Sequence, residues 1–200
     1  MKNGRYLNSV RCALPEGARG DLDLAFAGDA LAARRLMIVA PRRLRGHIAF
    51  LAYQLRTRNP AYREMMKAVW ALDTRHLLTA HWPQQTVRRM LARADFLIPD
   101  LNGPVSVYRP VSGATVKQAA SALCWSLLRD AAIADAARAD AQRPRILKAT
   151  LDPSDIVYFA NGRGEQEVVS RRPVRAFAIE DVALVSDAPR RRTSHQRRAR

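Results

Sequence analysis

Two carboxylates stand two residues apart in the stretch GEQEVV, which spans residues 164–169. If this stretch is extended, Glu165 and Glu167 lie on the same face, because side chains in a strand alternate with a period of two. Two neighbouring carboxylates repel each other, so one of them takes up a proton more readily. Such a pair can activate a nucleophile with one member and balance a developing positive charge with the other. A solvated acidic turn in a basic protein is the alternative interpretation.

Groups that bind anions or hydroxyls occur in two earlier segments. Tyr108 and Arg109 end a strand-like stretch, VSVYR, where a guanidinium can hold a phosphate or a ribose through several donors. The stretch CWS places Cys124 and Ser126 two residues apart. Cys124 and Trp125 also fit a second interpretation, in which they are core residues of a buried strand.

A loop with two glycines, YFANGRG at 158–164, precedes the glutamates. Glycine permits unusual backbone angles and a close approach to a ligand. Phe159 and Arg163 are therefore candidates either to contact an acceptor or to cap a hairpin. The histidines show no metal-ligand spacing, since His76 and His81 are five residues apart and fall out of phase on a helix. We expect no metal site.

Three segments, in this order, resemble the motifs of one enzyme class. They are VYRPVSG (107–113), CWSLLRDAA (124–132) and GEQEVV (164–169), and ARADFLIP (92–99) precedes them. Over about residues 60–187 the chain is similar to the mono-ADP-ribosyltransferases of the arginine, serine and glutamate class, which resemble cholera toxin in fold, and in particular to a bacterial and phage-borne group. That class has an arginine on a first strand, a Ser-x-Ser/Thr element on a later strand, and Glu-x-Glu or Gln-x-Glu before a final strand.

The resemblance implies that the protein transfers ADP-ribose from its substrate NAD to a protein acceptor and releases nicotinamide. It makes Glu167 the catalytic carboxylate, which also accepts a hydrogen bond from a ribose hydroxyl. It assigns Arg109 to NAD binding and the loop 158–164 to acceptor recognition, and it associates a glutamate at position 165 with arginine acceptors. An effector or toxin that acts in the cytoplasm of the producing or the host cell fits such an activity.

Two positions depart from the pattern of that class. Pro110 follows the arginine where the class has glycine, and proline removes a backbone donor there. Cys124 takes the place of the first serine, and a thiol is a poorer hydrogen-bond partner than a hydroxyl. Either Cys124 gives weaker support to Glu167 and the NAD ribose, or Ser126 provides that support in a shifted register. A weak or inactive transferase fold that binds nucleic acid or protein through its basic surface is therefore the alternative function.

The first hundred residues have a helical pattern, and short strands follow. Apolar residues recur every three or four positions in PRRLRGHIAFLAYQL and PAYREMMKAVWALDTRHLL. The apolar face of the second segment, from Tyr62 to Leu72, is expected to be core, and another helix is predicted from Pro83. After the turn cluster LNGP, helices are expected around 115–122 and at 130–141, and strands at 105–109, 145–151, 155–160, 167–170, 174–179 and 182–186. The sequence predicts an α+β fold, with a helical region at 1–100 and a mixed, largely antiparallel two-sheet catalytic core at 101–188.

The formal charge is +16, and 30 of the 34 basic residues are arginine. Clustered cations favour contact with nucleic acid, but a GC-rich coding bias also produces a chain rich in arginine and alanine. Six arginines fall in residues 189–200, which we expect to be a disordered tail. No apolar run approaches the roughly 18 residues of a membrane span, so we expect no membrane partner. Cys12 and Cys124 match no disulfide framework.

Overall fold

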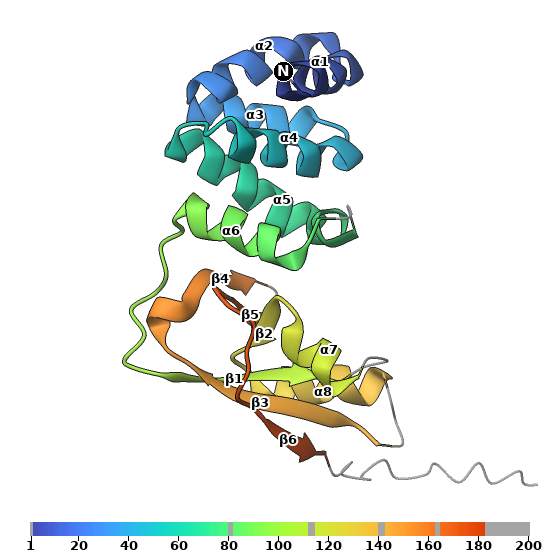
Figure 1. Cartoon of the computed structure of the whole chain (residues 1–200), viewed down its shortest axis with the longest axis vertical. Helices are drawn as coiled ribbons and strands as arrows, with labels where there is room; N and C mark the ends of the chain where they lie inside the picture. Colours follow the sequence, from blue (N-terminus) through green and yellow to red (C-terminus); the bar gives the residue numbers. More distant parts are fainter. Residues whose placement is uncertain (1, 80–81, 112–114, 140–142, 163–164, 183–200) are drawn as a thin grey trace, which may run out of the picture.

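The structure is a computed structural model that describes residues 2–79, 82–111, 115–139, 143–162 and 165–182. It has two parts, which we call the helical half, residues 2–94, and the sheet half, residues 105–182 (Figure 1). A connecting segment, residues 95–104, has no regular structure. The boundary predicted near residue 100 therefore falls inside this segment. No helix of the described residues is long and apolar enough to cross a membrane.

The described residues of the helical half are helical, as the sequence predicted, and they form six helices. They are α1 (Lys2–Ala13), α2 (Glu16–Ala27), α3 (Ala30–Val39), α4 (Arg42–Gln54), α5 (Asn59–Thr79) and α6 (Gln84–Ala94). Prolines directly precede α2, α4 and α6, because proline cannot continue a preceding helix and loses no hydrogen bond at a helix start. Gly28 ends α2 with φ at 110°, a left-handed conformation that glycine adopts readily. Figure 1 shows the helices stacked in layers, with α6 closest to the sheet.

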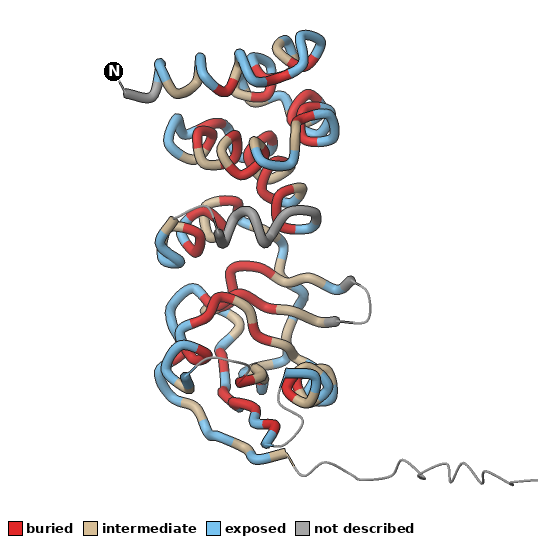
Figure 2. The backbone as a smooth tube through the Cα atoms, turned by 90° about the vertical axis from the view of Figure 1, so that its right-hand side faces the viewer, coloured by how far each residue is buried: buried red, intermediate tan, exposed pale blue. Residues whose placement is uncertain are grey.

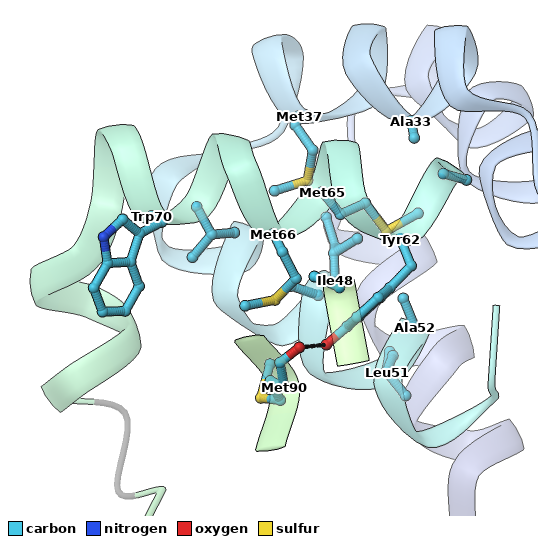
Figure 3. Packing of buried hydrophobic residues seen from close by; sticks show 14 of the residues in the cluster. Ala33, Met37, Ile48, Leu51, Ala52, Tyr62, Met65, Met66, Trp70 and Met90 are labelled. Carbon is cyan, nitrogen blue, oxygen red and sulfur yellow. Dashed lines mark hydrogen bonds between the residues drawn. The ribbon is translucent and has the colours of Figure 1, made fainter. Parts of the chain in front are cut away.

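Apolar side chains from all six helices form the core of the described helical half, and Figure 3 shows the part of it contributed by α3 to α6. The predicted core stripe on α5 is confirmed for its described side chains, which are at most 4% exposed: Tyr62, Met65, Met66, Val69 and Trp70. The side chain of Leu72, also predicted to belong to it, lies outside the described residues. The Tyr62 hydroxyl donates a hydrogen bond of 2.9 Å to the carbonyl of Met90 on α6. This bond satisfies the one polar atom that Tyr62 brings into an apolar interior.

The described residues of the sheet half form six strands. They are β1 (Val105–Pro110), β2 (Cys124–Ser126), β3 (Arg145–Leu151), β4 (Ile156–Gly162), β5 (Glu165–Ser170) and β6 (Ala178–Asp181). Every pairing is antiparallel, and the strand order is β4-β5-β2-β1-β3-β6. The prediction of two sheets is wrong for the described residues, which form one continuous sheet. The alternation of apolar and polar residues along one strand shows which side chains are buried. It does not show which strands are hydrogen-bonded to each other, so the number of sheets could not be predicted from it.

Three short elements connect the strands: α7 (Val116–Ser121), α8 (Arg129–Ala139) and the 3-10 turn η1 (Pro153–Asp155). Thr115 and Gln118 form a reciprocal capping box at the start of α7. The predicted strand at 174–179 is shifted, because hydrogen bonding to β3 begins at Ala178. Of the strand predicted at 182–186, residues 183–186 lie outside the described residues, as does the predicted tail.

The two halves share one hydrophobic core. Leu123, Val157, Tyr158 and Val169 of the sheet half belong to the same buried cluster as the helical residues. The ring of Tyr158 lies 5.4 Å from that of Trp70 on α5 and 4.8 Å from that of Phe96 in the connecting segment. In Figure 2, buried stretches occur in the helices and in the strands directly below them. The helical half therefore covers one end of the sheet rather than standing apart from it.

Candidate functional site

A pocket of about 540 Å³ opens where β1, β2 and β5 face α6 and α8. Its lining includes Gln84, Tyr108, Arg109, Cys124, Ser126 and Glu167. The structure thus brings together five of the residues that the sequence singled out, although they come from three strands and span 59 positions of the chain. Gln84 comes from the helical half, so both halves contribute to the wall.

Little backbone pairing joins β1 to β2 beside the pocket. β1 pairs with β3 along all six of its residues, whereas its register with β2 consists of the single pair Tyr108–Ser126. Beyond that pair the Arg109 guanidinium lies between the two strands, and its Nη1 donates a hydrogen bond to the Cys124 carbonyl. The Arg109 side chain thus bonds to β2 where backbone hydrogen bonds between β1 and β2 would otherwise form.

Arg109 retains donors beyond this one bond. Its Nε is buried and has no hydrogen-bond partner among the described residues. Burial lowers the pKa of Arg109, while Cys124 and Glu167 act in the opposite direction. A guanidinium stays protonated at any physiological pH, so the pocket contains a fixed cation with unused donor capacity. An anion that reaches it gains charge-assisted hydrogen bonds.

Cys124 is half-buried and is a free thiol. Burial raises its pKa to about 12, with a further rise from Glu167 and an opposing effect from Arg109 and Arg88. The thiol is therefore neutral at physiological pH and is not a nucleophile. Because Arg109 binds the carbonyl of residue 124, this contact is unaffected by the exchange of serine for cysteine.

Trp125 and Ser126 occupy opposite faces of β2. Trp125 is 1% exposed and packs in the core of the sheet half, as one of the two interpretations predicted. The Ser126 hydroxyl donates to the carbonyl of Leu128 and accepts from its amide, both at 3.0 Å, which shapes the turn into α8. A hydroxyl has two acceptor lone pairs, so one remains for a ligand. Tyr108 is half-buried and packs beside α8 residues of a third cluster.

Glu167 lies inside β5 rather than before a strand. It pairs with Ser126 of β2 on one side and with Ala160 of β4 on the other. Directly paired residues of an antiparallel sheet share a face, so Glu167, Ser126 and Tyr108 follow one another across the face that bears the pocket. The Glu167 charge raises the pKa values of Cys124 and Tyr158, after the larger effect of burial.

Glu165 is the first residue of β5 and pairs through its backbone with Gly162. The expectation that residues 165 and 167 lie on an extended segment is confirmed. The Glu165 side chain and the whole of Arg163 lie outside the described residues. Phe159 lies within β4, where it pairs with Val168 and packs partly against the core of the sheet half. It is therefore a strand residue and not part of an open loop.

Three further residues belong to this region, and the sequence did not single them out. Gln84 and Asp135 line the pocket from α6 and α8. Arg88 is buried behind it and donates hydrogen bonds to the carbonyl of Ser170 at the end of β5 and to the carbonyls of Ser121 and Ala122 just before β2. Gln84 and Arg88 belong to a predicted helix whose place against the sheet has no local signal in the chain.

Within the described part of the chain, no group of three His, Cys, Asp or Glu side chains is arranged to hold a metal ion. Comparison with protein-family models, with curated proteins and with solved structures finds no match.

Proposed function

We propose that this protein is a mono-ADP-ribosyltransferase that uses NAD and carries its catalytic carboxylate at Glu167. The observation that carries the proposal is the convergence of Arg109, Ser126 and Glu167, from β1, β2 and β5, on one pocket. These residues stand in the three segments that resemble the motifs of that class. The volume of about 540 Å³ lies within the range of about 300–1,000 Å³ that small-molecule sites occupy.

The charges of the pocket suit the reaction. NAD carries two phosphates, and Arg109 is a buried cation that still has donors to offer. When the bond between nicotinamide and ribose breaks, nicotinamide leaves with the electron pair and positive charge builds up on the ribose. A fixed carboxylate stabilises such an oxocarbenium-like transition state. Glu167 supplies that charge from β5, at the wall of the pocket.

The acceptor then attacks the ribose carbon and gives up one proton. Glu165 is two residues from Glu167 on β5 and is the proposed base for this proton. A guanidinium acceptor fits, because a carboxylate can both align the guanidinium and take its proton as the new bond forms. We therefore propose an arginine side chain of another protein as the acceptor.

The direct test is transfer of labelled ADP-ribose from NAD to proteins of a bacterial lysate. We expect Glu167→Gln to lower the rate by about 100- to 1,000-fold, since the loss of one preorganised electrostatic stabiliser has effects of that size. Glu180→Gln is the matched control, because Glu180 lies on β6 and pairs with Arg129 away from the pocket. Equal rates in the wild type and Glu167→Gln would contradict the assignment. Release of the label by neutral hydroxylamine identifies an arginine linkage.

A second function is favoured by the distribution of charge. Residues 1–100 contain 17 basic and 8 acidic residues, residues 101–188 contain 11 and 10, and residues 189–200 contain 6 and none. The positive charge thus lies mainly outside the sheet half, as in a protein that binds nucleic acid or an acidic partner with its helical half and tail. Salt-dependent binding of an RNA or DNA oligonucleotide, unchanged in Glu167→Gln, together with no transfer or NAD hydrolysis by the wild type, would favour this function.

A further inference from the structure

Arg88 on α6 connects the helical half to the strands that form the pocket. The side chain is 2% exposed. Its Nε donates to the Ser170 carbonyl at 3.1 Å, and its Nη2 donates to the carbonyls of Ser121 and Ala122 at 3.1 and 2.9 Å. One guanidinium thus binds two chain segments that lie 33 and 82 positions away in the sequence.

Both segments lead directly into the pocket. Ala122 is two residues before Cys124, and Ser170 follows Val169, the residue with which Cys124 pairs. Arg88 therefore binds the segment that enters β2 and the last residue of β5, at the same end of the ladder that these strands share. Ser170 is three residues from Glu167. A shift of either segment would change the spacing between Ser126, Glu167 and the Arg109 guanidinium, which binds the carbonyl of residue 124.

The chemistry of the contact favours arginine over any other residue. The carbonyls of Ser121 and Ala122 belong to the end of α7, where the helix leaves carbonyl groups unpaired and presents partial negative charge. Burial lowers the pKa of Arg88, and a buried charge is tolerated only where its donors are bonded. The planar guanidinium of Arg88 donates to three carbonyls in two directions. A lysine ammonium is a compact point charge and is less suited to this geometry.

We infer that Arg88 is a positioning residue of the pocket: it fixes the ends of β2 and β5 so that Cys124, Ser126 and Glu167 hold their places. The inference rests on the proposed function only for the chemical nature of the ligand. Gln84 supports it, because this residue lies one helical turn before Arg88 and lines the pocket itself. The helix α6 thus belongs to the pocket as well as to the helical half.

Arg93 provides a matched control on the same helix. Its guanidinium donates to the carbonyls of Ala52, Tyr53 and Thr57 at 3.2, 2.6 and 2.9 Å, and it lies 4.7 Å from the ring centre of Tyr62. Arg93 therefore makes the same kind of contact within the helical half, away from the pocket. Its loss should affect stability and leave β2 in place.

The test uses the alkylation of Cys124 by iodoacetamide at pH 8 in a Cys12→Ser background, in which Cys124 is the only thiol. Burial keeps this thiol protonated, so loosening of β2 exposes it and speeds the reaction, whereas loss of the Arg88 charge alone raises its pKa and slows the reaction. A faster reaction in Arg88→Met therefore reports the loosening of β2. We expect Arg88→Met to react at least about tenfold faster than Arg93→Met when the two are compared at equal free energy of unfolding, with Arg88→Lys in between. Equal rates for Arg88→Met and Arg93→Met would overturn the inference.

Two features keep this test decisive. If Arg88→Met does not fold, Arg88→Lys and Arg93→Lys supply the same comparison. Alkylation requires no NAD, so the role of Arg88 can fail while transfer by the wild type succeeds. Equally, transfer can fail while Arg88 is shown to hold β2.

Discussion

The helical half and the sheet half use arginine in different ways. In the helical half, Arg45, Arg63 and Arg93 donate to carbonyls at the ends of α3, α6 and α4, where helices leave these groups unpaired. In the sheet half, Arg109 binds one carbonyl and keeps a buried Nε without a partner among the described residues. An arginine whose donors are directed to helix ends stabilises the fold, whereas one with unused donors beside a cavity is prepared for a ligand.

The high net charge of the chain, +16, has a structural component. Part of the arginine content of the helical half is structural, because these side chains donate to carbonyls that helix ends leave unpaired. The sheet half has nearly equal numbers of basic and acidic residues, yet it contains the pocket with the opposed charges of Arg109 and Glu167. Net charge alone therefore does not predict where the candidate pocket lies.

The largest effect is expected from separating the two halves. Residues 101–200 alone should not fold, because Leu123, Val157, Tyr158 and Val169 would lose their cover, and each buried side chain of this kind contributes about 1.5–3 kcal/mol. That sum is comparable to the whole stability of a small domain. We expect weak near-ultraviolet circular dichroism and no cooperative thermal transition. A cooperative transition for this fragment would show that the halves are independent domains.

Next in size is the effect of Arg109→Met on NAD binding. The loss of charge-assisted hydrogen bonds of about 1.5–3 kcal/mol should raise the dissociation constant by about 10- to 100-fold. Isothermal titration calorimetry with NAD measures it, and Arg175→Met, an exposed residue of the sheet half, is the control. If the two variants bind NAD equally well, the unused donors of Arg109 serve another purpose.

The Cys124 thiol gives the sheet half a distinct pH dependence. Burial raises its pKa from an ordinary value near 9 to about 12, so the folded state keeps a proton that the unfolded state releases above pH 9. Stability from this group is complete below pH 9 and declines up to pH 12. Between pH 8 and 10, the wild type should lose about 1 kcal/mol of unfolding free energy relative to Cys124→Ser. Urea unfolding at both pH values measures this, and a constant difference would show that Cys124 is solvated.

The smallest effect concerns the helical half alone. Tyr62→Phe removes the 2.9 Å bond to the Met90 carbonyl and should lower the free energy of unfolding by about 0.5–1.5 kcal/mol. Alkylation of Cys124 at matched stability should not change, because Tyr62 does not line the pocket. An altered alkylation rate would mean that packing within the helical half is transmitted to β2.

Much of the fold could be predicted because its signals are local. The spacing of Tyr62, Met65 and Met66 predicts the buried side of α5, and the strand β3 begins and ends at the predicted residues. The convergence of residues on the pocket was implied by the order of the three motifs. Each of these inferences needs only neighbours in the sequence or a known order of segments.

The remaining features depend on contacts between distant segments. Backbone pairing between β1 and β2 is limited to one residue pair, and beside it the Arg109 side chain donates to the Cys124 carbonyl. The periodicity of the sequence gives no sign of this contact. The single sheet depends on which strands pair. Arg88 looks like any other arginine in a chain that contains 30, and its three acceptors become neighbours only after α6 packs on the sheet.

We propose that NAD binds in the pocket between Arg109 and Glu167, and a crystal structure of Glu167→Gln with NAD tests this binding site. The substitution should slow cleavage enough for the intact substrate to be seen. We predict that a phosphate of NAD accepts hydrogen bonds from Arg109 and that the nicotinamide-side ribose lies within hydrogen-bond distance of residue 167. An empty pocket at saturating NAD, or NAD bound elsewhere on the chain, would contradict the account.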